Sequence, residues 1–131
     1  MKYLLDTNVL LWFLGNDDRL PPAHRRTIED PETDVLVSIA TLWEISIKSS
    51  LGKLVLAQGL PTFLDAVTSA GAFDILNISV LHLKYLHGLP FLHRDPFDRI
   101  IIAQSKAERL GLLYTDAAFT PYLKLPAGED V

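Results

Sequence analysis

Residues 1–14 read MKYLLDTNVLLWFL, and this stretch decides the fold. The apolar run KYLLD at residues 2–6 predicts a short buried strand. A helical pattern of apolar residues begins directly after it, at Asp6 and Thr7, and stops at the turn-forming Gly15. A buried strand that leads at once into a helix is typical of α/β proteins.

The same alternation continues along the chain. Further apolar strands are predicted at residues 34–37, 73–78 and 112–115, and further helices at residues 22–30, 39–52, 61–71, 80–88 and 96–110. Ser38 and Ser79 are expected N-caps. Uniformly apolar strands between helices indicate a mostly parallel sheet covered on both faces. We therefore predict one three-layer α/β/α domain over residues 1–131, with a loose tail from about residue 126.

The composition limits the classes of function. The 131 residues are 49% hydrophobic and 21% charged, which suits a globular domain. No cysteine is present, so disulfides, thiolate zinc sites and cysteine nucleophiles are excluded. The four histidines show no zinc-ligand spacing. No signal peptide or membrane span is apparent, so we expect a soluble protein of the cytoplasm.

The formal net charge of -4 argues weakly against a dedicated nucleic-acid coat protein, because phosphate binding favours basic surfaces. That objection weakens if some of the acids hold a metal ion, since the bound cation then faces the phosphate. The charge alone therefore does not exclude a nuclease.

Four acids from distant segments are placed to meet at one edge of the predicted sheet. Asp6 ends the first strand and Asp116 the fourth, and ligands bind beyond the carboxyl ends of parallel strands. Asp98 lies in the first turn of the helix before the fourth strand, and Glu44 lies in the helix after the second. Clustered acids repel one another, so one of them should have a raised pKa in the absence of metal.

Each acid also has a simpler interpretation. Asp6 and Asp116 would each cap the helical turn that follows. Glu44 would pair with Lys48 four residues later, as on many exposed helix faces. Asp98 would complement the dipole at the start of its helix. Taken singly, none of the four points to chemistry, whereas their joint pattern does.

Four blocks of sequence resemble the PIN-domain ribonucleases, with the nearest likeness to the VapC-type toxins of toxin–antitoxin pairs. The blocks are LLDTNVLLW at residues 4–12, VSIATLWEI at 37–45, HRDPFDRIIIAQ at 93–104 and LYTD at 113–116. The segment KSSLGKL at residues 48–54 also looks like this subgroup. The resemblance runs in the correct order from residue 1 to about residue 125.

The resemblance implies which residues form the site. The family's four acids fall on Asp6, Glu44, Asp98 and Asp116, as catalytic residues and metal ligands for Mg²⁺, with Mn²⁺ as the alternative. Asp6 and Asp98 are the firmest direct ligands, and the other two bind directly or through water. Asp95 also lies in the third block and is assigned to capping the helix.

The implied function is a metal-dependent endoribonuclease that cleaves RNA phosphodiester bonds with metal-activated water. The resemblance further implies the toxin of a toxin–antitoxin pair, a homodimer, and inhibition by a VapB-like antitoxin laid across the acidic cleft. It does not indicate which RNA is cut. Two other functions stay open, a metal-dependent phosphatase and a non-catalytic interaction module. A haloacid-dehalogenase-type phosphatase would need a second Asp two residues after Asp6, where Asn8 stands.

Several neighbours are candidate supporting residues. Thr7 occupies the small hydroxyl position after the first acid, and Asn8 stands where relatives often carry His. His93 would act as a proton carrier or phosphate contact, or be structural. Arg99, like Arg94, would contact RNA phosphates or antitoxin acids, or simply be solvated. The tryptophans at positions 12 and 43 are expected in the core or in dimer packing.

Overall fold

The computed structural model describes residues 1–69 and 71–125, so the predicted loose tail from about residue 126 lies outside the described residues. Its centre is a four-stranded sheet in the order β3-β2-β1-β4, in which every pair is parallel. The strands are β1 (Lys2–Leu5), β2 (Asp34–Ser38), β3 (Asp74–Leu76) and β4 (Gly111–Leu113). The predicted α/β class with its parallel sheet is confirmed.

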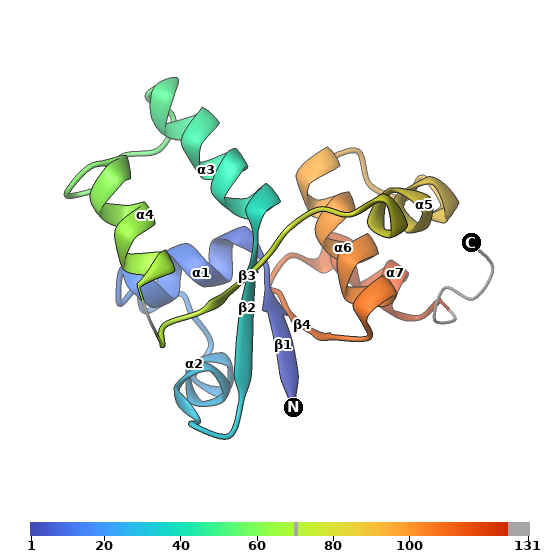
Figure 1. The fold of residues 1–131 in the computed structure, drawn as a ribbon, viewed down its shortest axis with the longest axis horizontal. Coiled ribbons are helices and arrows are strands. Elements are labelled where there is room, and N and C mark those ends of the chain that lie inside the picture. The colour runs from blue at the N-terminus through green and yellow to red at the C-terminus, as the bar shows by residue number, and fades with distance from the viewer. Residues whose placement is uncertain (70, 126–131) are drawn as a thin grey trace.

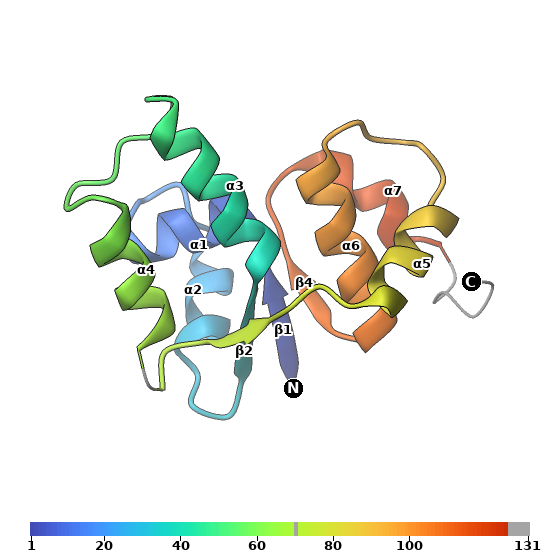
Figure 2. The same ribbon diagram turned by 45° about the horizontal axis from the view of Figure 1, so that its top comes forward.

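Helices cover both faces of the sheet. They are α1 (Thr7–Leu14), α2 (Pro22–Glu29), α3 (Ile39–Ser50), α4 (Leu60–Thr68), α5 (Val80–Gly88), α6 (Pro96–Glu108) and α7 (Thr120–Leu123), with a 3₁₀ turn at Ala117–Phe119. Figures 1 and 2 show α1, α2 and α4 on one side of the sheet and α5, α6 and α7 on the other. Helix α3 rises from the end of β2 and contacts α6 across that end of the sheet. The three-layer arrangement is therefore as predicted.

Side-chain caps begin the helices where the sequence predicts them. Ser38 accepts a hydrogen bond from the Ala40 backbone N–H, and Ser79 accepts one from that of His82. The His82 ring in turn accepts from the Ser79 N–H, which completes a capping box. Each cap satisfies a backbone donor that the helix itself leaves free.

Several element boundaries differ from the predictions, including the ends of α3 at Ser50 and of α6 at Glu108, where residues 52 and 110 were predicted. Strand β3 covers only Asp74–Leu76 of the predicted 73–78, and β4 ends at Leu113 rather than at residue 115. The chain turns out of β4 because the Thr115 N–H donates to the Asp6 side chain instead of to a neighbouring strand. Helix α4 stops at Thr68, before the predicted end at Gly71. Helix α7 was not predicted.

Two apolar layers hold the sheet between the helices. One contains Leu5, Val9, Leu10 and Ile45 with strand residues and side chains of α4. The opposite side contains small clusters built around Ile100, Ala103, Ile102, Phe119 and Tyr122. None of the helices in the described part of the chain combines the length and apolar character needed to cross a membrane.

Candidate active site

A small pocket of about 150 Å³ lies at the carboxyl end of the sheet. We call it the acid pocket, and its lining residues are Asp6, Thr7, Asn8, Glu44, Lys48, Asp95, Asp98, Asp116 and Phe119. All four acids singled out from the sequence thus line one cavity, although they come from four separate segments of the chain. The parallel sheet produces this convergence, because its strand ends deliver the following residues to one edge.

Asp6 lies at the base of the pocket and is only 3% exposed. Its Oδ1 accepts from the Val9 N–H at 2.7 Å, and its Oδ2 accepts from the Thr115 N–H at 3.2 Å. The first bond caps α1, so the simpler interpretation as an N-cap is correct. Capping does not remove the carboxylate from the pocket, because each oxygen has a further lone pair.

Glu44 is buried as well, with 4% exposure. Its Oε1 accepts from the Thr7 hydroxyl at 2.7 Å, and its Oε2 accepts from the Lys48 ammonium at 2.6 Å. The pair with Lys48 is therefore present, as the simpler interpretation predicts, but it is not a surface pair. The Thr7 contact gives that residue a defined place beside the second acid.

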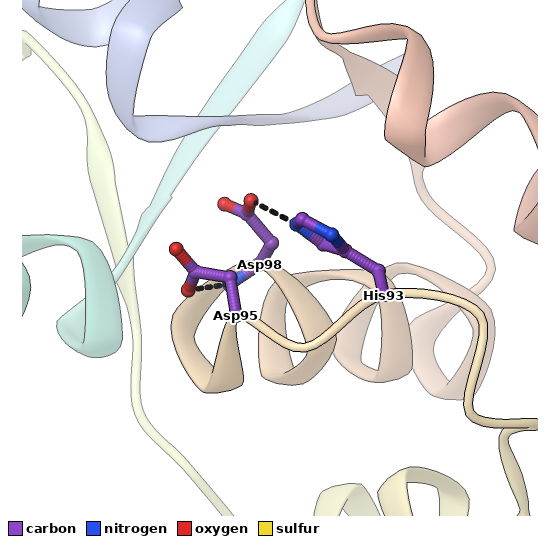
Figure 3. A group of neighbouring side chains, drawn as sticks. All are labelled: His93, Asp95 and Asp98. Atoms are coloured by element: carbon purple, nitrogen blue, oxygen red, sulfur yellow. Dashed lines mark hydrogen bonds and ion pairs between the residues drawn. The ribbon is translucent and has the colours of Figure 1, made fainter.

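His93, Asp95 and Asp98 form the tightest cluster of metal-ligand atoms in residues 1–69 and 71–125. One atom from each lies within 4.8 Å of the other two. Figure 3 shows the three side chains gathered over the first turn of α6. His93 Nε2 lies 2.8 Å from Asp98 Oδ2, and Asp95 Oδ1 accepts from the Asp98 N–H at 3.1 Å. Asp95 is the N-cap of α6, as predicted, but it also lines the pocket.

Asp116 does not end β4, contrary to the prediction. The strand stops at Leu113, and Asp116 lies three residues later, where its Oδ1 accepts from the Ala118 N–H at 2.9 Å. Asp116 is exposed and caps the 3₁₀ turn at Ala117–Phe119. It still reaches the acid pocket, because the turn folds back over the sheet edge.

Two of the carboxyl groups have pKa values shifted upward. The pKa of Asp6 is raised to about 6, chiefly by burial, with a smaller contribution from the negative charge of Asp98. The pKa of Asp98 is also raised, first by burial and then by Asp95 and Glu44, while the His93 hydrogen bond opposes the rise. The expected upward shift is confirmed, although desolvation contributes more than repulsion between the acids.

Arg99 is not the surface residue that the sequence suggested. It is 9% exposed, and its guanidinium donates to the Pro90 carbonyl and to the Tyr122 hydroxyl, both at 3.0 Å. It joins the segment before α6 to the start of α7. Arg99 does not line the acid pocket, and the predicted contact with RNA or antitoxin stays a prediction. Arg94 is exposed.

The two tryptophans differ in how far they are buried. Trp12 is partly buried against the main core, as expected, and Arg19 lies over its ring. Trp43 is 59% exposed and contacts the edge of Phe97 at a centroid distance of 5.2 Å. The face of α3 that carries Trp43 is thus not buried, whereas Glu44 beside it is.

Sequence reasoning missed two features of the pocket. It treated Lys48 only as a surface partner for Glu44, and it treated Asp95 only as a cap. The i, i+4 spacing found the ion pair but could not show that one partner is buried. Asp95 lies three residues before Asp98, which brings both to the same turn of the helix.

The lining suits a hard divalent cation. Carboxylate oxygens dominate the pocket, and Mg²⁺ and Mn²⁺ prefer oxygen ligands. The raised pKa values of Asp6 and Asp98 show that their negative charges lack sufficient compensation within the chain. A bound cation would supply that compensation.

Comparisons with known proteins agree with this fold. The chain resembles a chain of VapBC2 from Rickettsia felis, in a crystal structure with a promoter DNA fragment, at 19% identity and a TM-score of 0.70, with 93% of each chain covered. A chain of FitAcB from Neisseria gonorrhoeae is similar at 19% identity and a TM-score of 0.61, with 92% of each covered. No match was found among curated protein sequences. The family model of the PIN domain matches residues 3–122, and the chain therefore belongs to the PIN-domain family.

Proposed function

We propose that the protein is a metal-dependent endoribonuclease whose active site is the acid pocket. PIN domains are generally nucleases, and membership of that family supports hydrolysis of a phosphodiester bond. The observation that carries the proposal is the convergence of Asp6, Glu44, Asp98 and Asp116 on one pocket at the sheet edge. RNA is the proposed substrate, and the cytoplasm is the proposed place of action.

Asp6 and Asp98 are the proposed direct ligands of Mg²⁺ or Mn²⁺, with Asp116 and Glu44 completing the acidic set directly or through water. Such an ion, when bound, polarises the scissile phosphate and lowers the pKa of a water molecule. Asp6 is suited to this role because two backbone N–H groups fix its carboxylate before any ion arrives. His93 holds one oxygen of Asp98 and leaves the other available.

The test is cleavage of single-stranded RNA by the wild type, Asp6→Asn and Asp98→Asn, with Mg²⁺ and with EDTA. Both substitutions keep the size of the side chain and remove its charge, so we expect each to lower the rate by about 100-fold or more. EDTA should abolish wild-type cleavage. Equal, metal-independent activity in the three proteins would reject the nuclease and leave an interaction module as the better interpretation.

The proposed biological role is that of a VapC-type toxin, a homodimer that a VapB-like antitoxin inhibits. Both structural relatives come from toxin–antitoxin complexes. The surface offers a place for a partner, because a groove of about 590 Å³ between α1 and α4 is lined by Leu11, Trp12, Leu56 and Phe63. Asn8 lines both this groove and the acid pocket. An antitoxin segment in the groove would therefore reach the acids.

A substitution in the groove tests this role separately from catalysis. Co-expression with a short protein encoded beside the gene should give a co-purifying complex that no longer cleaves RNA. Val55→Asp should weaken that complex and restore cleavage, because Val55 lines the groove, is exposed in the free protein, and its replacement places a charge in an apolar contact. A complex that forms equally well with Val55→Asp would exclude the groove as the docking site.

A further inference from the structure

Lys48 is the cationic side chain of the acid pocket. Among the residues that the structure describes, it is the one lysine or arginine in the pocket lining. Arg99 is held by the Pro90 carbonyl and the Tyr122 hydroxyl, and His93 by Asp98. An RNA phosphate entering the pocket would therefore meet one permanently charged amino-acid donor, the Lys48 ammonium.

The Lys48 ammonium is fixed in place rather than free to move. Its Nζ lies 2.6 Å from Oε2 of Glu44, a carboxylate that is 5% exposed, while the lysine side chain is 48% exposed. Glu44 is thus buried inside the protein, whereas the Lys48 side chain is half exposed at the acid pocket. Surface i, i+4 pairs have two mobile partners, so this arrangement differs from an ordinary helix-stabilising pair.

The remaining contacts of Glu44 indicate that it holds this lysine. Both carboxylate oxygens are in use, Oε1 by the Thr7 hydroxyl at 2.7 Å and Oε2 by Lys48. Thr7 itself is 7% exposed and also lies 3.4 Å from the Thr41 hydroxyl. The Lys48 ammonium already offsets the charge of Glu44, so a metal ion bound to this carboxylate would face a positive charge 2.6 Å from the Oε2 atom.

We propose that Lys48 is a catalytic residue that contacts the scissile phosphate, and that Glu44 is its positioning residue rather than a direct metal ligand. This inference rests on the proposed nuclease function and assigns the substrate contact within it. The ammonium donates hydrogen bonds to a non-bridging phosphate oxygen and offsets the negative charge that grows there as the phosphodiester is attacked. Asp6, Asp98 and Asp116 remain available for the cation.

The test compares Lys48→Met, Lys48→Arg and Glu44→Gln with the wild type, and uses Lys53→Met as a matched control. Lys53 is exposed on the loop after α3 and does not line the pocket. RNA cleavage is measured at saturating Mg²⁺ to separate kcat from KM, and Mn²⁺ binding to each protein alone is measured by calorimetry. Circular dichroism establishes that each variant is folded.

Lys48→Met should lower kcat by about 10- to 100-fold with a smaller change in KM, and Lys48→Arg should retain part of the rate. Mn²⁺ affinity should stay the same or rise in Lys48→Met, since a competing positive charge has been removed. Glu44→Gln keeps the acceptor for Thr7 but loses the charge that holds Lys48. It should lower kcat similarly, and combining it with Lys48→Met should add little further loss. The Mn²⁺ affinity of Glu44→Gln should fall by less than that of Asp98→Asn, because a nearby negative charge is lost while the ligands remain.

Two results would overturn the proposal while leaving the nuclease in place. One is an unchanged kcat in Lys48→Met alongside inactive Asp98→Asn. The other is a loss of Mn²⁺ affinity in Glu44→Gln as large as that in Asp98→Asn, with activity restored by excess metal, which would make Glu44 a direct ligand. A wild type that cleaves no RNA rejects the proposed function itself, and the role of Lys48 in it.

Discussion

Two groups of buried ionisable side chains are built in opposite ways. The His82 cluster consists of His82, Ser79, Gln104 and Glu108 at the contact between α5 and α6. His82 is 1% exposed, its Nδ1 accepts from the Ser79 N–H at 3.0 Å, and its Nε2 lies 2.7 Å from Glu108 Oε2. In the acid pocket, by contrast, acids face acids, and Lys48 and His93 pair with only Glu44 and Asp98.

The polar groups of the His82 cluster stabilise the fold, whereas the carboxyl groups of the acid pocket lower its stability. Both ring nitrogens of His82 have partners, whereas the amide oxygen of Gln104 is the one buried side-chain nitrogen or oxygen without a partner in the described part of the chain. The acid pocket keeps two carboxyl groups with raised pKa values. Protein sites retain such unfavourable charges where a function uses them.

The largest expected change in stability is in the His82 cluster. His82→Ala should lower the free energy of unfolding by about 3 kcal/mol, because it leaves a cavity and frees the partners of both ring nitrogens. Urea unfolding measures the change, with the exposed His87→Ala as the matched control. RNA cleavage per folded molecule should be unaffected. A loss below about 1 kcal/mol would show that this cluster contributes less than its contacts suggest.

Arg99→Met should lower the free energy of unfolding by about 2 kcal/mol, since the Pro90 carbonyl and the Tyr122 hydroxyl each lose a charged donor. Arg94→Met, at an exposed position, should change stability little. Thermal unfolding of Arg99→Met and Arg94→Met measures whether Arg99, and not Arg94, stabilises the fold. Full stability combined with weaker RNA binding in Arg99→Met would support the original prediction of an RNA contact.

Asp6→Asn should change the pH dependence of stability in metal-free protein. The pKa of Asp6 is about 6 in the folded state and 3.8 as its ordinary value, so the native state binds more protons between these values. Wild-type stability therefore falls as pH rises through that window. The wild type should lose about 2 kcal/mol relative to Asp6→Asn between about pH 4.5 and about pH 7.5.

Urea unfolding in EDTA at several pH values measures this effect. The comparison within each pH cancels the titration of groups that do not interact with Asp6, whereas the coupled Asp98 contributes to the difference. Asn still offers an oxygen to the Val9 N–H, so the cap of α1 persists. Parallel pH profiles for the two proteins would contradict the raised pKa.

The smallest expected effect is that of Glu108→Gln. The glutamate side chain is 41% exposed, and glutamine can still accept from the His82 ring. The free energy of unfolding should fall by about 0.5 kcal/mol, which careful urea titrations resolve. A loss as large as that of His82→Ala would mean that the charge of Glu108, rather than the packing of His82, holds the cluster together.

Local patterns were sufficient to predict the fold. The strand and helix in residues 1–14 and the caps Ser38, Ser79 and Asp95 follow from apolar spacing and from side-chain oxygens that satisfy free N–H groups. The ends of β3 and β4 were less accurate, because they depend on tertiary contacts. The Thr115 N–H, for example, donates to the Asp6 carboxylate and not to a neighbouring strand.

The candidate site was predictable in its acids but not in their surroundings. Sequence spacing brought Asp98 and Asp116 to the sheet edge, yet it could not show that Glu44 is buried while its partner Lys48 is half exposed. The burial of Arg99 was not predicted, for the same reason. Its partners, the Pro90 carbonyl and the Tyr122 hydroxyl, lie on segments that only the folded chain brings together.

The most direct test of the account is a calorimetric titration of Mn²⁺ into metal-free wild type, Asp98→Asn and a folded His82→Ala. The acid pocket should bind the ion in the wild type and in His82→Ala, since the His82 cluster serves only the fold. Asp98→Asn should bind at least about tenfold more weakly. Equal binding by the wild type and Asp98→Asn would contradict the claim that the carboxylates of the acid pocket hold a metal ion.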